Sequence, residues 1–108
     1  MKRQILHRED GLRKVRQLKE RLKTEGVPFD AIYLYGSVAR NQAHEWSDID
    51  VAIVGVPFRA TRHEENMVVR LLRRDIDSRI EPICLHSEDF QNVYFALARE
   101  IERTGVEA

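Results

Sequence analysis

The chain has 108 residues, with 18 basic and 18 acidic side chains, one cysteine and 43% hydrophobic residues. This length favours a single domain over residues 1–108, because two separate cores would each be too small. The lone Cys84 excludes an intramolecular disulfide and a cysteine-rich zinc site. No run approaches the roughly 18 apolar residues of a membrane-spanning helix, and no apolar signal-peptide core follows the charged start Met1–Arg3. We therefore expect a cytoplasmic protein without membrane contact.

Zero net charge hides an uneven distribution of charge along the sequence. Residues 1–25 carry nine basic and four acidic side chains, a net of +5, whereas residues 75–108 carry three basic and eight acidic ones, a net of −5. Such a separation suits electrostatic pairing with a partner or an anionic ligand. The alternative is that each end of the chain simply has a solvated helix face.

The first part of the sequence predicts a helix, a strand and a short helix. Apolar residues recur at three- and four-residue steps through residues 8–24, which indicates an amphipathic helix that ends before Gly26. Residues 31–35 form an apolar and aromatic run typical of a strand. Gly36-Ser37 interrupts this run, and a short helix over residues 38–41 would take Ser37 as its N-cap.

The second part predicts a central strand and a helix. Residues 48–54 are apolar on both faces after their first positions, which is typical of a strand inside a sheet. A helix over residues 61–75 follows this strand. Its predicted apolar stripe consists of Met67, Val68, Leu71 and Leu72.

The last part predicts an edge strand and one or two closing helices. Pro82 cannot donate a backbone hydrogen bond, so the strand over residues 80–85 is expected at a sheet edge. Ser87 and the acidic residues after it are typical of a helix start, and the helical region should stop near Gly105. The apolar residues of this region are Phe90, Val93, Tyr94, Leu97 and Ile101. The order of elements predicts an α+β (α/β two-layer) domain.

Gly36-Ser37 is the first candidate for a functional site, because it lies between a strand and a predicted helix. Glycine lets the backbone turn tightly and lets a ligand approach, and a helix start offers N–H groups to a phosphate. The alternative is structural, since Gly-Ser is common at such junctions.

Three carboxylates form the second candidate. Asp48 and Asp50 are two residues apart on a predicted strand, so they share one face and repel each other unless a cation lies between them. Magnesium prefers one or two carboxylates together with phosphate oxygens and water. Glu81 lies among apolar residues of the next strand, where a carboxylate is costly unless it is paired or metal-bound. The alternatives are a turn-capping aspartate and a solvent-facing Glu81.

Together these residues resemble the minimal nucleotidyltransferase (MNT) branch of the DNA polymerase beta-like nucleotidyltransferase superfamily. The similarity runs from Leu34-Tyr35-Gly36-Ser37-Val38-Ala39-Arg40 through Ser47-Asp48-Ile49-Asp50-Val51-Ala52-Ile53. It extends to residues 79–83 and to Leu97-Ala98-Arg99-Glu100-Ile101, and so covers most of the chain. The resemblance implies the nucleotidyltransferase fold, with a small mixed sheet of about three or more strands flanked by helices.

The resemblance also implies a role for each site residue. Gly36 and Ser37 would hold the β- and γ-phosphates of a nucleoside triphosphate, with Arg40 and Ser47 as further phosphate contacts. The catalytic metal ligands would be Asp48, Asp50 and Glu81, which would bind two divalent ions, most readily Mg²⁺. Glu81 could serve as a metal ligand or accept the proton of the attacking hydroxyl.

Other residues are weaker candidates. The four histidines lack the i, i+4 spacing of a helical metal pair. Tyr33 and Tyr35 lie on one strand face and are expected in the core, as is Cys84. The cluster of Arg70, Arg73 and Arg74 fits either RNA binding or, more simply, a solvated helix face.

The resemblance implies a magnesium-dependent transfer of AMP from ATP to an acceptor hydroxyl. MNT proteins include antitoxins that modify a tyrosine of a HEPN ribonuclease toxin, so we expect a protein partner of this kind, with a homo-oligomer as another way to hold the acceptor. A catalytically silent module that neutralises its partner by binding is the main alternative. RNA binding by the basic first helix is less favoured, because that helix lacks interleaved exposed aromatic residues.

Overall fold

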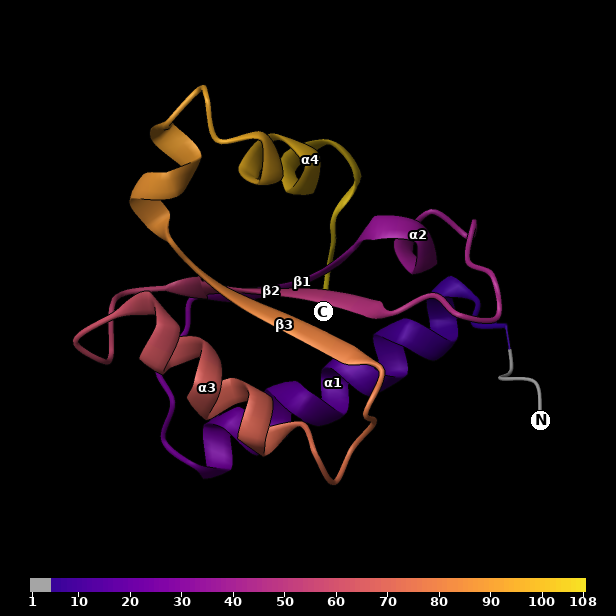
Figure 1. Cartoon of the computed structure of the whole chain (residues 1–108), viewed down its shortest axis with the longest axis horizontal. Coiled ribbons are helices and arrows are strands. Elements are labelled where there is room, and N and C mark those ends of the chain that lie inside the picture. Colours follow the sequence, from indigo (N-terminus) through magenta and orange to yellow (C-terminus); the bar gives the residue numbers. More distant parts are fainter. Residues whose placement is uncertain (1–4) are drawn as a thin grey trace.

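The computed structural model describes residues 5–108, so the charged start Met1–Arg3 lies outside the described residues. Four strands form one sheet in the order β3-β2-β1-β4. β1 is antiparallel to both β2 and β4, whereas β2 and β3 are parallel. The sheet is therefore mixed, which confirms the predicted fold class (Figure 1). The strand bounds are β1 (Ala31–Tyr35), β2 (Ile49–Gly55), β3 (Ile80–His86) and β4 (Val106–Glu107).

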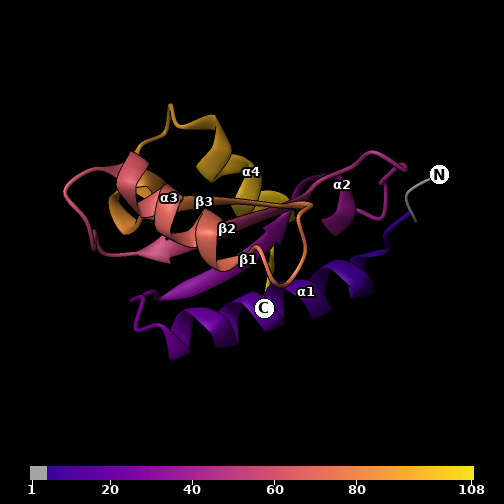
Figure 2. The ribbon, with the colours of Figure 1, turned by 60° about the horizontal axis from the view of Figure 1, so that its bottom comes forward.

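Helices lie on both faces of the sheet. Figure 2 shows α1 and α4 on opposite sides of the strands. The helix α1 (Arg8–Thr24) shares its face with α3 (Arg62–Leu72), and α4 (Ala96–Thr104) shares the other face with the 3-10 helix η1 (Ser87–Gln91). The four-residue α2 (Gly36–Ala39) directly follows β1. None of the helices within residues 5–108 is long and apolar enough to cross a membrane.

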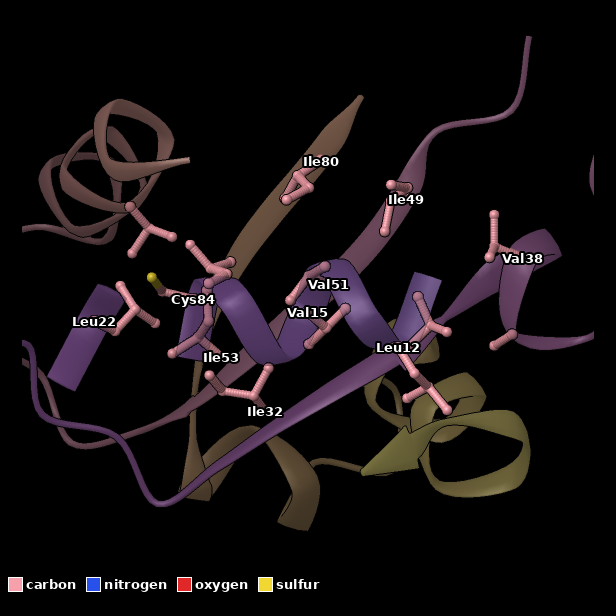
Figure 3. Packing of buried hydrophobic residues seen from close by; sticks show 14 of the residues in the cluster. Leu12, Val15, Leu22, Ile32, Val38, Ile49, Val51, Ile53, Ile80 and Cys84 are labelled. Carbon is pink, nitrogen blue, oxygen red and sulfur yellow. The ribbon is translucent and has the colours of Figure 1, made fainter. Parts of the chain in front are cut away.

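The main core lies between the sheet and the α1–α3 layer. Alternate side chains of each strand point to this side, and Figure 3 shows Val15 of α1 among Ile32, Val51 and Ile80 of three strands. All four of these side chains are fully buried. The opposite face carries a smaller buried cluster, which consists of Ala52, Val54, Leu85 and Ile101. One face of the sheet therefore supplies most of the packing, and the other has room for polar side chains.

The elements before β2 follow the predictions with one correction. The first helix has the predicted bounds, and the first strand spans residues 31–35 as expected. The short helix begins earlier than predicted, at Gly36, and its N-cap is Tyr35 rather than Ser37. The reason is the positive φ of Gly36, +75°, which turns the chain immediately after the strand and places Ser37 inside the helical turn.

The apolar stripe predicted for α3 is only partly correct. Thr61 is the N-cap and its side chain accepts a hydrogen bond from the Glu64 N–H. Val68 and Leu72 pack against the core as expected, but Met67 and Leu71 are 45% and 56% exposed. The buried residues of α3 are Glu65 and Val69, so the face that packs on the core is rotated from the predicted stripe.

The C-terminal region contains confirmed and wrong predictions. Pro82 does lie on an edge strand, since β3 is the first strand of the sheet order. The last helix ends at Thr104, directly before Gly105. Val93 and Tyr94, predicted within the closing helices, lie instead in the connection between η1 and α4, where they are 68% and 92% exposed. The two-residue strand β4 was not predicted.

Candidate active site

A row of three polar side chains crosses the sheet on the face opposite α1. In the strand register, Tyr35 of β1 lies beside Asp50 of β2, and Asp50 lies beside Glu81 of β3. Directly paired residues of neighbouring strands project to the same face. Asp48 precedes β2 by one residue and is exposed. The structure therefore brings the predicted carboxylates of two distant segments to one end of the parallel strand pair.

Gly36 makes room for the central carboxylate of this row. Its φ of +75° is a left-handed conformation that side chains rarely adopt. A Cβ atom added to Gly36 would overlap with Oδ2 of Asp50. The glycine predicted to hold phosphate is thus also the residue that lets the turn after β1 lie directly against Asp50.

Ser37 and Ser47 connect the turn to the loop before β2. The Ser37 hydroxyl donates to Oγ of Ser47 over 3.3 Å, and the His44 N–H donates to the same oxygen over 2.9 Å. Ser47 is 7% exposed. The observed role of Ser47 is therefore to fix the loop that delivers Asp48, and its predicted contact with phosphate stays a prediction, as does that of Ser37.

Arg40 lies beside the row, together with a carboxylate that the sequence had not singled out. Its Nη1 is 3.2 Å from Oε1 of Glu100 on α4, and its Nε donates to Gln42 over 3.2 Å. Glu100 is close enough to raise the pKa of both Asp50 and Tyr35. The segment that contains Glu100 was part of the family resemblance, but an acidic residue on an amphipathic helix has no distinguishing local pattern. Only the packing of α4 shows that it faces the site.

Burial and crowding of negative charge dominate the electrostatics. Burial raises the pKa of Asp50 to about 6, and the charges of Asp48, Glu100 and Glu81 add to this effect, while Arg40 opposes it. Burial also raises the pKa of Tyr35 to about 12, and the charges of Asp50, Glu100 and Glu81 add to this effect. Tyr35 packs, partly buried, against the smaller buried cluster, as expected of a core residue, and it also lies beside Asp50 in the strand register. The site thus has an excess of negative charge that a cation would relieve.

The two aspartates and Glu81 differ in their pairing. Among residues 5–108, neither the Asp48 nor the Asp50 side chain has a hydrogen bond or an ion pair. Glu81 accepts a hydrogen bond from Nη2 of Arg70 over 3.1 Å. Within the described part of the chain, no three His, Cys, Asp or Glu side chains converge as a metal cage would require. Glu81 is thus engaged by Arg70 in this arrangement, and its predicted sharing of a metal site with the two aspartates stays a prediction.

The donor set nevertheless fits a divalent cation at the aspartates. Asp48 and Asp50 offer carboxylate oxygens that have no hydrogen-bond or ion-pair partner within residues 5–108, and the Asp50 carboxylate lies directly against the Gly36 turn. Hard oxygen donors of this kind suit Mg²⁺, which keeps part of its water shell and completes its coordination with phosphate oxygens.

The other candidates have structural roles. His86 lies between Glu65 and Arg62, with distances of 2.8 Å from Nε2 to Oε1 and 3.1 Å from Nδ1 to Nη2. Glu65 is 1% exposed, so this network joins α3 to the end of β3. Cys84 is buried as expected, and burial raises the pKa of its thiol to about 12. Arg70 does not belong to a purely solvated face, since it reaches Glu81.

The mixed sheet, the glycine turn and the aspartate pair define a nucleotidyltransferase-type domain. The sequence matches the nucleotidyltransferase domain family over residues 15–104. The chain therefore belongs to this family. No curated protein sequence gives a significant match.

Solved structures with the same fold include a candidate nucleotidyltransferase and toxin–antitoxin proteins. A candidate nucleotidyltransferase from Sulfolobus solfataricus aligns with 19% identity and a TM-score of 0.62, over 93% of this chain and 80% of that one. A variant of the toxin–antitoxin complex MntA–HpeT aligns with 17% identity and a TM-score of 0.62, over 85% and 69%. A toxin–antitoxin structure with AMP-PNP aligns with 21% identity and a TM-score of 0.60, over 88% and 69%. At these identities the likeness shows the fold.

Proposed function

We propose that this protein is a magnesium-dependent nucleotidyltransferase that transfers AMP from ATP to a hydroxyl group, most specifically to a tyrosine of a partner protein. The observation that carries the proposal is the pair Asp48 and Asp50, which have no partner within residues 5–108 and lie beside the Gly36 turn. A carboxylate pair left unpaired in a crowded, partly buried site is what a cation-dependent phosphate reaction requires.

Each residue of the site has a place in this reaction. Gly36 and Ser37 bind the β- and γ-phosphates, with Arg40 and Ser47 as further phosphate contacts. Magnesium ions held by Asp48, Asp50 and Glu81 would supply positive charge at the reacting phosphate. The acceptor oxygen forms a bond to the α-phosphorus, the bond to the β-phosphate oxygen breaks, and pyrophosphate leaves. The hydroxyl proton passes to Glu81 or to water.

Three kinds of support favour a protein acceptor in a toxin–antitoxin setting. The family match gives the transferase class. Two of the similar structures are toxin–antitoxin complexes, and one of them has AMP-PNP. The charge separation along the chain, +5 over residues 1–25 and −5 over residues 75–108, suits an electrostatic partner. A cytoplasmic HEPN-type toxin fits this description, and we propose it as the partner.

The direct test is label transfer from ATP that is radioactive at the α-phosphate. The full-length protein is incubated with Mg²⁺ and with the product of the neighbouring gene, and the labelled residue is mapped by mass spectrometry. We expect labelled tyrosine with the wild type and none with Asp50→Asn. Asp75→Asn is a matched control, because Asp75 is exposed and pairs with Arg21 away from the site. The proposal is contradicted if wild-type protein that binds ATP transfers no label, or if Asp50→Asn transfers as much label as the wild type.

One observation favours a second candidate, a silent module that neutralises its partner by binding alone. Glu81, the third predicted metal ligand, is paired with Arg70. Under this alternative, Asp50→Asn would still protect cells from the partner toxin. Under the proposed function, the variant would lose that protection while it still binds the toxin.

A further inference from the structure

Arg40 lies at a point where it could neutralise the site. It follows α2 as the C-cap residue, four positions after Gly36, and its positive charge lowers the pKa of Asp50. Its guanidinium is nonetheless bound elsewhere, with Nη1 on Glu100 and Nε on Gln42, each over 3.2 Å. Arg40 is therefore drawn toward α4 and away from a direct ion pair with the aspartates.

Glu100 is held firmly enough to direct Arg40. Its neighbours on α4, Ala98 and Ile101, are 0% and 2% exposed, and they fix the helix on the sheet. Gly105 lies tightly against the Ile101 carbonyl, and its N–H donates to that oxygen over 2.8 Å. The chain then returns to the sheet, where Val106 pairs with Leu34 of β1. The backbone that carries Glu100 is thus fixed on the sheet, and its carboxylate reaches Arg40 after the turn that follows β1.

A fourth negative charge in this place is unfavourable by itself. Glu100 adds to the repulsion at Asp50, to which Asp48 and Glu81 also contribute. Within residues 5–108, Glu100 has one ion pair, which it forms with Arg40, and this pair offsets part of the repulsion. Without Glu100, the flexible guanidinium of Arg40 would be attracted to the carboxylates of Asp48 and Asp50. It would then compete with a cation for these carboxylates.

We infer that Glu100 is a positioning residue that holds Arg40 beside the Gly36-Ser37 turn, where its guanidinium binds the terminal phosphates of the nucleotide instead of the aspartates. This inference rests on the proposed function, because it assumes a triphosphate at that turn. Arg40 contacts the ligand, whereas Glu100 acts through Arg40. Loss of either Arg40 or Glu100 should therefore weaken the binding of a nucleoside triphosphate and leave the binding of a monophosphate unchanged.

The test compares the affinities for AMP-PNP and AMP by calorimetry, with Mg²⁺ and the full chain. We expect Arg40→Ala to weaken AMP-PNP binding about tenfold or more, and Glu100→Ala to weaken it about three- to tenfold. AMP affinity should stay within about twofold for both variants. The double variant should bind no more weakly than Arg40→Ala, because Glu100 has nothing left to position. Glu100→Gln keeps the side-chain size and should show the same loss if charge is responsible.

Glu102→Ala is the matched control, because Glu102 is on the same helix and pairs with Arg99. It should leave both affinities unchanged. Full additivity of Arg40→Ala and Glu100→Ala overturns the inference, as does equal loss for AMP and AMP-PNP. Weaker binding of Mn²⁺ without nucleotide by Glu100→Gln also overturns it, because Glu100 would then be a metal ligand. If the wild type binds no AMP-PNP, the proposed function fails as well, whereas normal AMP-PNP binding by Glu100→Ala removes only the inference.

Discussion

The absence of a Cβ atom on Gly36 allows the Asp50 carboxylate to lie directly against the turn after β1. Gly36 can adopt φ +75° without strain and has no Cβ that would meet the Asp50 carboxylate. The carboxylate in turn lies in a row with Tyr35 and Glu81 and is partly buried. A turn residue and a strand residue 14 positions apart are thus fitted to each other, and a change at either should affect both stability and ligand binding.

Gly36→Ala tests this fit. We expect a loss of stability of at least about 1–2 kcal/mol from the left-handed backbone, and a loss of AMP-PNP binding because Asp50 must move. Urea unfolding and calorimetry measure the two effects. Gly26→Ala is a matched control, since Gly26 has φ +73° but no atom within 4 Å of an added Cβ. It should lose stability from the backbone alone and bind AMP-PNP normally; equal binding by both variants contradicts the prediction.

Asp50→Asn should stabilise the nucleotide-free protein in a pH-dependent way. The pKa of Asp50 is raised from 3.8 to about 6 on folding, mainly by burial. Its contribution to stability is therefore present below about pH 4 and is lost as the pH rises through 6. After allowance for solvent screening of this half-buried group, Asp50→Asn should gain on the order of 1–2 kcal/mol at pH 8.

Urea unfolding in EDTA at pH 4 and at pH 8 measures this gain. At pH 4 the gain should be much smaller than at pH 8, because the carboxyl is neutral in the folded wild-type chain and still about half protonated in the unfolded chain. Asp75→Asn should show no such rise with pH. A gain that is the same at both pH values shows that charge repulsion is not its cause.

At the scale of single elements, the exposed edge of β3 is protected by its own sequence and by neighbouring residues. β3 is an edge strand, yet the backbone N–H groups at alternate positions along it are blocked or bound within the chain. Pro82 has no N–H, and the N–H groups at residues 80, 84 and 86 donate to Asp77, Asn66 and Asp89. These contacts should prevent another strand from pairing with this edge.

Asn66→Ala should destabilise the protein by about 1–3 kcal/mol, because it leaves the buried N–H of Cys84 without an acceptor. The bond to Oδ1 of Asn66 is 2.8 Å long, and Cys84 is 2% exposed. Urea unfolding measures the loss, and light scattering reports any self-association through the open edge. Asn66→Asp keeps the oxygen acceptor and should lose less. If both variants lose the same stability, the side-chain amide rather than the acceptor is responsible.

The whole molecule divides into two layers. The packed layer is the main core between the sheet and α1–α3, and the second layer, on the α4 face of the sheet, carries the candidate site. The sequence predicts the first layer better than the second. Periodicity indicates α1 and the strands because each has a repeating apolar pattern. The spacing of Gly36, Asp48 and Asp50 predicts the site because Gly36 follows the end of one strand and the aspartates lie at the start of its antiparallel neighbour. The contacts of Arg70 and Glu100 depend on how α3 and α4 pack, and no local pattern records that. For the same reason Met67 and Leu71 were wrongly assigned to the core.

This division predicts that stability and nucleotide affinity respond to different layers. Leu18 on α1 is 0% exposed, and Leu18→Ala should lose about 2–5 kcal/mol. Where Leu18→Ala is still folded, its affinity for AMP-PNP should be close to that of the wild type, because α1 packs on the face away from Asp50. Ile101 on α4 is 2% exposed and lies next to Glu100, so Ile101→Ala should weaken AMP-PNP binding in addition to its loss of stability.

Urea unfolding and calorimetry on the same samples separate the two effects. Val93→Ala is a control for both variants, because Val93 is 68% exposed in the connection before α4 and should change neither quantity. If folded Leu18→Ala loses as much affinity as Ile101→Ala, the two layers are coupled through the sheet. The position of Glu100 would then depend on the entire core rather than on the packing of α4, and the charge arrangement at Asp50 would be a property of the whole fold.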